Sequence, residues 1–177
     1  MEFREKYAKI EWERRFLLAR FPVPENVTRV RKIIDRYIIG TTLRLREEIE
    51  RGGETRFKLT QKLPRAASGG QQGFISTMYL SEAEFEVFAT LPSRLLTKAR
   101  HSIHPFGVDV FEGELQGLVL AEAESDSAKE AAALILPTFL QHEVTDDTRF
   151  TGGRLVNASR HEVEKWVSRY GVSLNSN

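Results

Sequence analysis

The chain has 177 residues, of which 41% are hydrophobic and 29% charged, so it fits one domain of ordinary size with its own core. The formal net charge of +1 excludes a global field for nucleic acid or an anionic membrane, and the absence of cysteine excludes disulfides and thiolate metal sites. Because the chain has no apolar run of membrane-spanning length and no secretory signal, we expect a cytoplasmic protein that does not associate with membranes.

The first half of the chain is predicted to form strands joined by turns. Two glycines within 51–54 accept the positive φ of a tight hairpin, so 35–47 and 56–62 are predicted strands on either side of that turn. Around them we predict a polar extension over 1–9, a strand over 10–19, a short helix over 27–34 and a flexible loop over 63–73.

The second half mixes strands with short helices. Ser81 with Glu84, and Ser127 with Glu130, have the spacing of a capping box and predict helices that begin there, the second running to 134. The other predicted elements are strands over 74–80, 95–103, 108–112, 117–124 and 143–145, and a helix over 159–170 that covers the sheet or forms a homodimer surface. This order of elements indicates a single α+β domain over 1–177 with an antiparallel sheet that can close.

Like charges recur at a fixed spacing within the predicted strands. In a strand, side chains at i and i+2 lie on one face, about 6.5–7 Å apart. The pairs are Glu11/Glu13, Arg44/Arg46, Lys98/Arg100, Glu122/Glu124 and the wider Lys58/Lys62.

Two interpretations of these pairs compete. They could be solvated faces of an antiparallel sheet whose apolar face covers the core. Alternatively, they line the lumen of a barrel, because whole strands carry one sign and like charges at neighbouring positions repel unless a ligand compensates them. Carboxylates from two strands would bind a hard divalent cation, Mg²⁺ or Mn²⁺, and the lysines and arginines would bind a polyanion.

The ordered motifs resemble those of the CYTH domains, also called triphosphate tunnel metalloenzymes. Glu11-Trp12-Glu13-Arg14-Arg15 resembles the E-x-E-x-K strand of that family, with Arg15 at the position of its lysine. The other matches are Leu43–Arg46 for R-x-R, Leu59–Lys62 for L-T-x-K, Lys98–Arg100 for K-x-R, and the hairpin from Asp109–Gly113 to Gly117–Glu124 with a second E-x-E.

The resemblance implies a closed eight-stranded antiparallel β-barrel with helices packed outside, and hydrolysis of a triphosphate in its lumen. Glu11, Glu13, Glu122 and Glu124 would hold the metal, with Asp109 as a further ligand. Arg15, Arg44, Arg46, Lys58, Lys62, Lys98 and Arg100 would bind the phosphates. Of these two sets, Glu11, Glu13, Arg15, Lys98 and Arg100 are the expected catalytic residues.

The sequence leaves three other functions open. One is an adenylate cyclase of the class IV type, a lyase on the same scaffold. The second is a non-catalytic protein that binds polyphosphate or phosphorylated ligands, and the third is an interaction domain with charged sheet faces. For the hydrolase, the cyclase and the binding protein alike, the expected partner is a small molecule that contains a triphosphate.

Overall fold

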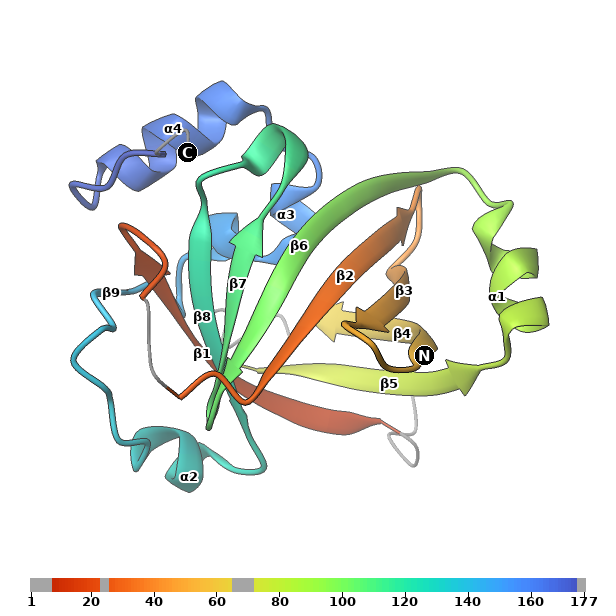
Figure 1. Cartoon of the computed structure of the whole chain (residues 1–177), viewed down its shortest axis with the longest axis horizontal. Coiled ribbons are helices and arrows are strands. Elements are labelled where there is room, and N and C mark those ends of the chain that lie inside the picture. The colour runs from red at the N-terminus through yellow and green to blue at the C-terminus, as the bar shows by residue number, and fades with distance from the viewer. Residues whose placement is uncertain (1–7, 23–25, 65–71, 175–177) are drawn as a thin grey trace.

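A computed structural model describes residues 8–22, 26–64 and 72–174, and the strands among them all belong to one antiparallel sheet (Figure 1). The strands are β1 (Lys9–Leu18), β2 (Arg29–Ile38), β3 (Leu43–Glu50), β4 (Thr55–Pro64), β5 (Gln72–Leu80), β6 (Ser93–Ile103), β7 (Phe106–Phe111), β8 (Val119–Ser125) and β9 (His142–Glu143). The helices are α1 (Glu82–Ala89), α2 (Ala128–Ala132), α3 (Gly152–Leu155) and α4 (Arg160–Ser168), with short 3-10 turns η2 (Gly113–Leu115) and η3 (Thr148–Phe150).

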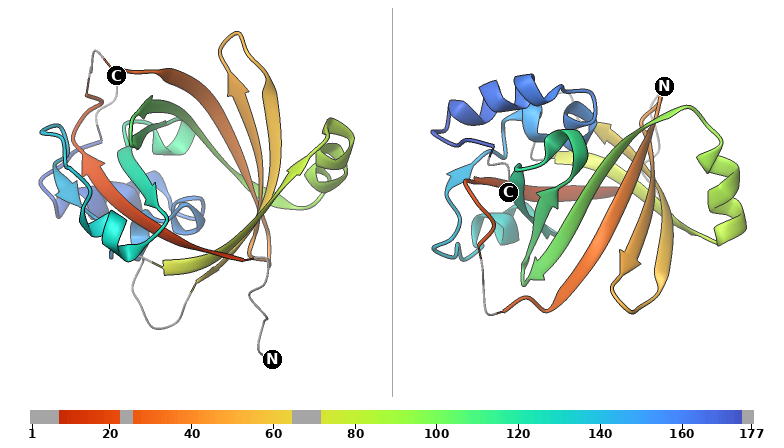
Figure 2. Two further views of the ribbon diagram at one scale, coloured as in Figure 1. Left: turned by 90° about the horizontal axis from the view of Figure 1, so that it is seen from below. Right: turned by 45° about the horizontal axis from the view of Figure 1, so that its top comes forward.

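The sheet closes on itself. Its strand order is β5-β4-β3-β2-β6-β7-β8-β1, and β5 also pairs with β1, so eight strands form a ring (Figure 2, left). The first half of β1 pairs with β5 and its second half with β8, which is how one strand joins both ends of the sheet. The short β9 pairs with the second half of β1, on the edge away from β8. The prediction of a closed eight-stranded antiparallel barrel in an α+β fold is confirmed.

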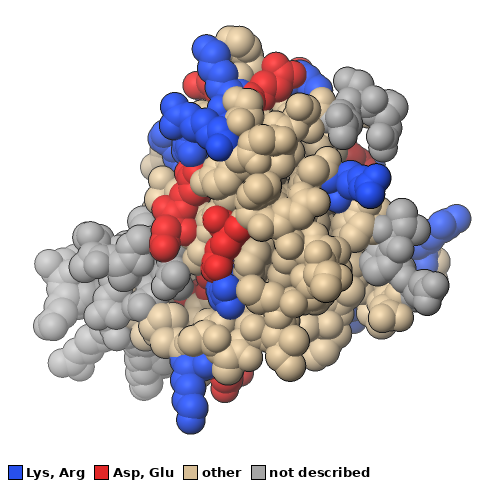
Figure 3. Space-filling view, turned by 90° about the vertical axis from the view of Figure 1, so that its left-hand side faces the viewer, with Lys and Arg blue, Asp and Glu red and all other residues tan. Residues whose placement is uncertain are grey.

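Strand alternation sends the charged pairs into the barrel and most apolar side chains outward. Outside, Ile38, Leu45 and Leu59 pack against Phe85 of α1. A second outer cluster lies over β1, β7 and β8, and α2 packs against β1 and β8. The outer face on the side of β9 and α2 shows mainly neutral side chains with charged ones scattered among them (Figure 3). The interpretation of the charged pairs as solvated outer faces is therefore wrong.

The C-terminal segment fills one end of the lumen. Leu17, Leu96 and Leu120 follow the same alternation as Arg15, Lys98 and Glu122, yet they are buried in a cluster with Phe150 and Leu155. A β-carbon added to Gly152 of α3 would lie 2.0 Å from the hydroxyl oxygen of Tyr37, so α3 fits closely against the lumen side of β2. The far end of the barrel is thus apolar and occupied.

Two neighbouring predicted elements are wrong. Residues 27–34 were expected to form a short helix and 35–47 one strand, whereas β2 crosses that boundary and β3 begins only at Leu43. Tertiary pairing decides the outcome, because β2 bonds along its length to both β3 and β6. The apolar residues of β2 do not form one face: Ile33 points inward with Arg31 and Asp35, so the alternation that identifies a strand is broken.

The other predicted elements are present with shifted ends, whereas α3, η2 and η3 were not predicted. The turn at 51–54 joins β3 to β4, with Gly52 at φ +74°, and α1 begins at the predicted capping box of Ser81 and Glu84. Most of the predicted loop over 63–73, at 65–71, and most of the polar extension over 1–9, lie outside the described residues. Among the described residues, no helix is long and apolar enough to cross a membrane.

Candidate active site

All the predicted site residues point inward, from different strands, into the lumen of the barrel. Register places Arg15 opposite Glu122 and Glu13 opposite Glu124 across β1 and β8, and Arg46 opposite Lys58 across β3 and β4. Lys98 and Arg100 of β6 lie beside β7, where Arg100 faces Asp109. Residues that are up to 113 positions apart in sequence, Glu11 and Glu124, therefore share one compartment.

Asp35 of β2 holds the R-x-R pair of β3. Its carboxylate is fully buried and accepts hydrogen bonds from Nε and Nη2 of Arg46, at 2.6 and 2.9 Å. Nε of Arg44 lies 3.6 Å from the same carboxylate. Although burial opposes ionisation, the two guanidinium groups hold the pKa of Asp35 well below its ordinary value. One buried anion thus fixes two cations in place.

Asp109 of β7 has the same role for the K-x-R pair. It is fully buried, accepts a hydrogen bond from Nζ of Lys98, and receives two more from Arg100 at 2.6 Å each. The side chain of Arg100 runs across Gly107, where an added β-carbon would be 3.1 Å from its Cδ. The glycine leaves room for Arg100 to extend from Asp109 to Glu122, which it reaches at 2.6 Å.

The cationic side chains of β2, β3, β4 and β6 form one wall of the lumen, which we call the basic wall, and Glu48 of β3 is a third carboxylate within it. Glu48 continues the i, i+2 series after Arg46 and accepts a hydrogen bond from Nζ of Lys58 at 3.0 Å. Oε1 of Glu48 lies 3.5 Å from Nη1 of Arg46, and burial opposes but does not prevent a lowered pKa of this carboxyl. The wall therefore contains more cations than carboxylates: Arg31, Arg44, Arg46, Lys58, Lys98 and Arg100 against Asp35, Glu48 and Asp109.

The opposite wall is acidic. Lys62 of β4 reaches across to Glu11, whose two oxygens lie 2.9 and 3.2 Å from Nζ. Arg15 is buried beside Glu13, with 3.4 Å between Nε and Oε1. Glu124 is the most exposed of the four glutamates and lies at the rim.

Glu13 and Glu122 respond differently to this environment. Burial and the charge of Glu122 raise the pKa of Glu13 to about 7, against the attraction of Arg15 and Lys62. Burial also opposes ionisation of Glu122, but Lys98 and Arg100 hold its pKa well below the ordinary value. A further cation bound between Glu13 and Glu122 would allow both carboxyls to ionise. The acidic wall therefore has less positive charge than its glutamates need.

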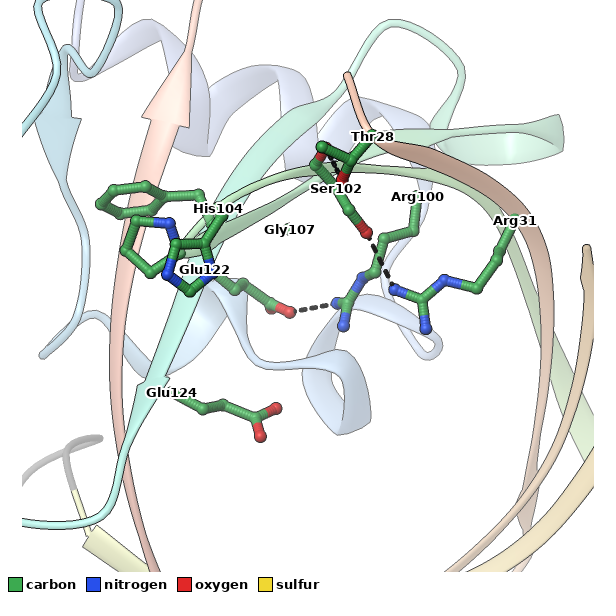
Figure 4. A pocket seen from close by; sticks show the side chains of 10 residues that line it. Thr28, Arg31, Arg100, Ser102, His104, Gly107, Glu122 and Glu124 are labelled. Carbon is green, nitrogen blue, oxygen red and sulfur yellow. Dashed lines mark hydrogen bonds and ion pairs between the residues drawn. The ribbon is translucent and has the colours of Figure 1, made fainter. Parts of the chain in front are cut away.

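A cavity of about 320 Å³ opens between the two walls at the end of the barrel opposite α3. Figure 4 shows Arg31 and Arg100 projecting into it from one side and Glu122 and Glu124 from the other. Thr28, Ser102 and His104 lie around its edge (Figure 4). Cationic and anionic side chains therefore face each other across a space that a small charged ligand can enter.

The carboxylates do not form a ready-made metal cluster. Within the parts of the chain that the structure describes, no three side chains from His, Asp and Glu lie close enough together to hold a metal ion. Glu11 and Glu122 are each paired with a cation, Lys62 and Arg100, instead. The metal assignment of these glutamates and of Asp109 stays a prediction.

Sequence reasoning missed Arg31, Asp35 and Glu48. The incorrect helix over 27–34 concealed Arg31. The incorrect strand over 35–47 begins at Asp35 and places it on the face opposite Arg44 and Arg46. Arg29 and Arg31 have the same i, i+2 spacing as the other pairs, and Glu48 extends the Arg44/Arg46 series by one step. Extending that series would have found Glu48, and a search for further pairs would have found Arg31, whereas no such pair points to Asp35.

The closed eight-stranded barrel with charged walls fits the fold of the CYTH domains, or triphosphate tunnel metalloenzymes. The inorganic triphosphatase NE1496 has a solved structure that is 28% identical to this chain, with a TM-score of 0.53 over 84% of this chain and 95% of that one. A structure of the hypothetical protein NE1496 gives 28% identity and a TM-score of 0.54 over 84% and 99%.

A structure from Bacillus halodurans, provisionally assigned as an adenylate cyclase, covers 97% of this chain and 95% of that one. Its identity of 14% and TM-score of 0.47 are too low to support a function. No family model matches the chain, and no curated protein matches it.

Proposed function

We propose that this protein hydrolyses a triphosphate in its lumen with the help of a divalent metal ion. The observation that carries the proposal is the pair of facing walls, one with surplus cations and one with the glutamates of two E-x-E strands. The likeness to an inorganic triphosphatase at 28% identity supports the same class of substrate. Inorganic triphosphate is the first candidate, and nucleoside and thiamine triphosphates follow.

The basic wall would bind the phosphates. Arg46 and Arg100 are held by two-point contacts to buried carboxylates, so their remaining N–H groups are fixed before a ligand arrives. Fixed donors lose little entropy on binding, and guanidinium groups match phosphate oxygens in pairs. Arg15, Arg44, Lys58, Lys62 and Lys98 would add the remaining positive charge.

The acidic wall fits a hard divalent cation by its chemistry. Glu11, Glu13, Glu122 and Glu124 offer only oxygen donors, which Mg²⁺ and Mn²⁺ prefer. The raised pKa of Glu13 marks a carboxyl that a nearby cation would ionise. Asp109 is already committed to Lys98 and Arg100, so its contribution would be to orient these two cations.

The chain's own residues would then act by positioning and charge neutralisation. A bound metal would supply an activated water and neutralise phosphate oxygens. Arg100 joins the two walls, because it touches both Asp109 and Glu122, and can thus place a phosphate next to the glutamates. Charge interactions are stronger in the buried lumen than in water. They would therefore stabilise the negative charge that spreads over the phosphoryl oxygens in the transition state of phosphoryl transfer.

A product analysis separates the candidate reactions. The protein is incubated with tripolyphosphate, ATP or thiamine triphosphate, each with Mg²⁺ or Mn²⁺, and the products are resolved. We expect free phosphate. Pyrophosphate with cyclic AMP would instead identify a cyclase, and thermal stabilisation by tripolyphosphate without turnover would identify a binder.

Glu122→Gln tests the acidic wall. Because Glu122 lies at the junction of the two walls, this variant should lose metal-dependent turnover by at least about 100-fold, the scale of a lost electrostatic contact to the reacting group. Glu112→Gln, a change of the same kind at an exposed position near Lys32, is the matched control and should keep full activity. Turnover of Glu122→Gln at the control's level would refute the assignment.

A further inference from the structure

Arg31 lies on the lumen side of β2 and is not among the residues that the motifs predict. Register places it directly opposite Arg100 of β6, and both side chains project into the cavity between the walls (Figure 4). Residues opposite each other on antiparallel strands have β-carbons about 4.5–5.5 Å apart. Two guanidinium groups therefore share this part of the cavity.

Their partners differ. Arg100 is neutralised by Asp109 and Glu122, both at 2.6 Å. Arg31 donates from Nη2 to the hydroxyl of Ser102 at 3.2 Å, and its distance to Glu48 is 3.8 Å, which is too long for a hydrogen bond. Its Nε is buried and has no hydrogen-bond partner among the described residues. Arg31 thus has donors left for a ligand.

An anion at this position would satisfy those donors. Burial lowers the pKa of Arg31, and the charge of Arg100 lowers it further, against the attraction of Glu48. A negative ligand between the two guanidinium groups would offset both effects. The hydroxyl of Ser102, which accepts from Arg31, still has its own proton to donate to such a ligand.

The closed end of the lumen fixes which part of a substrate lies here. Because the C-terminal segment occupies the far end, a triphosphate reaches the basic wall from the cavity side. Its outermost group then lies near Arg31. In inorganic triphosphate this group is a phosphate with terminal charge, whereas in ATP or thiamine triphosphate it is the esterified phosphate with its organic substituent.

We propose that Arg31 binds the outermost phosphate of inorganic triphosphate at the mouth of the lumen and favours it over triphosphates that carry an organic group. This inference rests on the proposed function and adds a residue that selects among its substrates. The groups around the cavity that can bind an anion are the guanidinium groups of Arg31 and Arg100 and the hydroxyl of Ser102 (Figure 4); Pro105, Phe106 and the two glutamates complete its lining.

Calorimetric titration without divalent metal tests the proposal independently of turnover. Arg31→Gln should bind tripolyphosphate about 30-fold more weakly, the scale of one or two charge-assisted hydrogen bonds, and ATP or thiamine triphosphate less than about 3-fold more weakly. Arg31→Lys should recover part of the loss, because it restores the charge without the planar donor pair.

Arg29→Gln is the matched control. Arg29 is on the same face of the same strand, but both ends of its guanidinium bind Glu50, with Nε at 2.7 Å from Oε1. This variant should bind tripolyphosphate within about 3-fold of the unaltered protein, since the charge that it removes is already paired.

The outcomes are distinguishable. Unaltered binding of tripolyphosphate by Arg31→Gln would overturn the inference, and so would equal weakening for all three ligands. If the unaltered protein binds none of them in this titration, the inference fails, whereas the proposed function fails only if the product analysis with Mg²⁺ or Mn²⁺ also shows no turnover. Thermal unfolding checks each variant, and if Arg31→Gln is unfolded, the ratio of tripolyphosphate to ATP affinity in Arg31→Lys decides: an unchanged ratio overturns the inference.

Discussion

Replacing Asp35 with Asn should cost this protein several kcal/mol of stability, although the two side chains have nearly the same shape. The carboxylate is fully buried, binds Arg46 at two points and lies 3.6 Å from Arg44. An asparagine has one acceptor oxygen and would turn an NH₂ group toward a guanidinium. Removing one partner from a buried ion pair costs about 3–5 kcal/mol, because the other charge is left buried and uncompensated.

Glu50→Gln provides the comparison. Glu50 also binds an arginine at two points, but Arg29 and Glu50 have side chains that are 30% and 32% exposed. Water can replace the lost contact there, so we expect a cost of about 0–1 kcal/mol. In a domain of this size 1 kcal/mol corresponds to about 2–4 °C, so Asp35→Asn should lower Tm by roughly 6–20 °C and Glu50→Gln by at most about 4 °C.

The dependence on pH gives the same prediction a second measurement. The pKa of Asp35 is lowered in the folded protein, so its stabilising effect is complete above the unfolded value of about 4 and is lost as pH falls from there toward the folded value. In urea unfolding between pH 7 and pH 3, the difference between the unaltered protein and Asp35→Asn should be constant down to about pH 4 and then narrow. Equal midpoints for Asp35→Asn and Glu50→Gln at pH 7 would refute the reasoning.

Two glycines provide further tests of the packing. Gly152→Ala should lower the free energy of unfolding by about 1–3 kcal/mol, since its β-carbon would lie 2.0 Å from the hydroxyl of Tyr37, whereas Gly153→Ala, with nothing within 4 Å, should be neutral or slightly stabilising in urea unfolding. Gly107→Ala should displace Arg100 and weaken tripolyphosphate binding by about 10-fold in calorimetry, with Gly153→Ala unchanged; full affinity would show that Arg100 does not need this path.

The sequence predicted those features that depend on a few neighbouring residues. The glycine pair at 51–54 fixed a hairpin, and Ser81 with Glu84 fixed the start of α1, because turns and caps are local chemistry. The i, i+2 pairs identified the lumen side of five strands, since alternation in a strand needs no tertiary information.

Features that depend on pairing partners could not be predicted in this way. In β2 the polar Lys32 faces out and the apolar Ile33 faces in, so neither face is uniform and the segment also satisfies a helical spacing. Only its bonds to β3 and β6 make it a strand. Filling of the far end by Phe150 and Leu155 is likewise a contact between distant segments.

The buried carboxylates change the reason to expect an anionic ligand. Along a single strand, Arg44 and Arg46 or Lys98 and Arg100 look like uncompensated repulsion that only a ligand would relieve. The neighbouring strands relieve much of it instead, with Asp35 and Asp109 each shared by two cations. Because each carboxylate is shared, the basic wall keeps more cations than carboxylates, and the contacts hold the cationic side chains in place. A wall that is fixed in place and still net positive is better suited to bind phosphate than a flexible, fully exposed cluster. Its side chains lose little conformational entropy on binding, because they are already ordered.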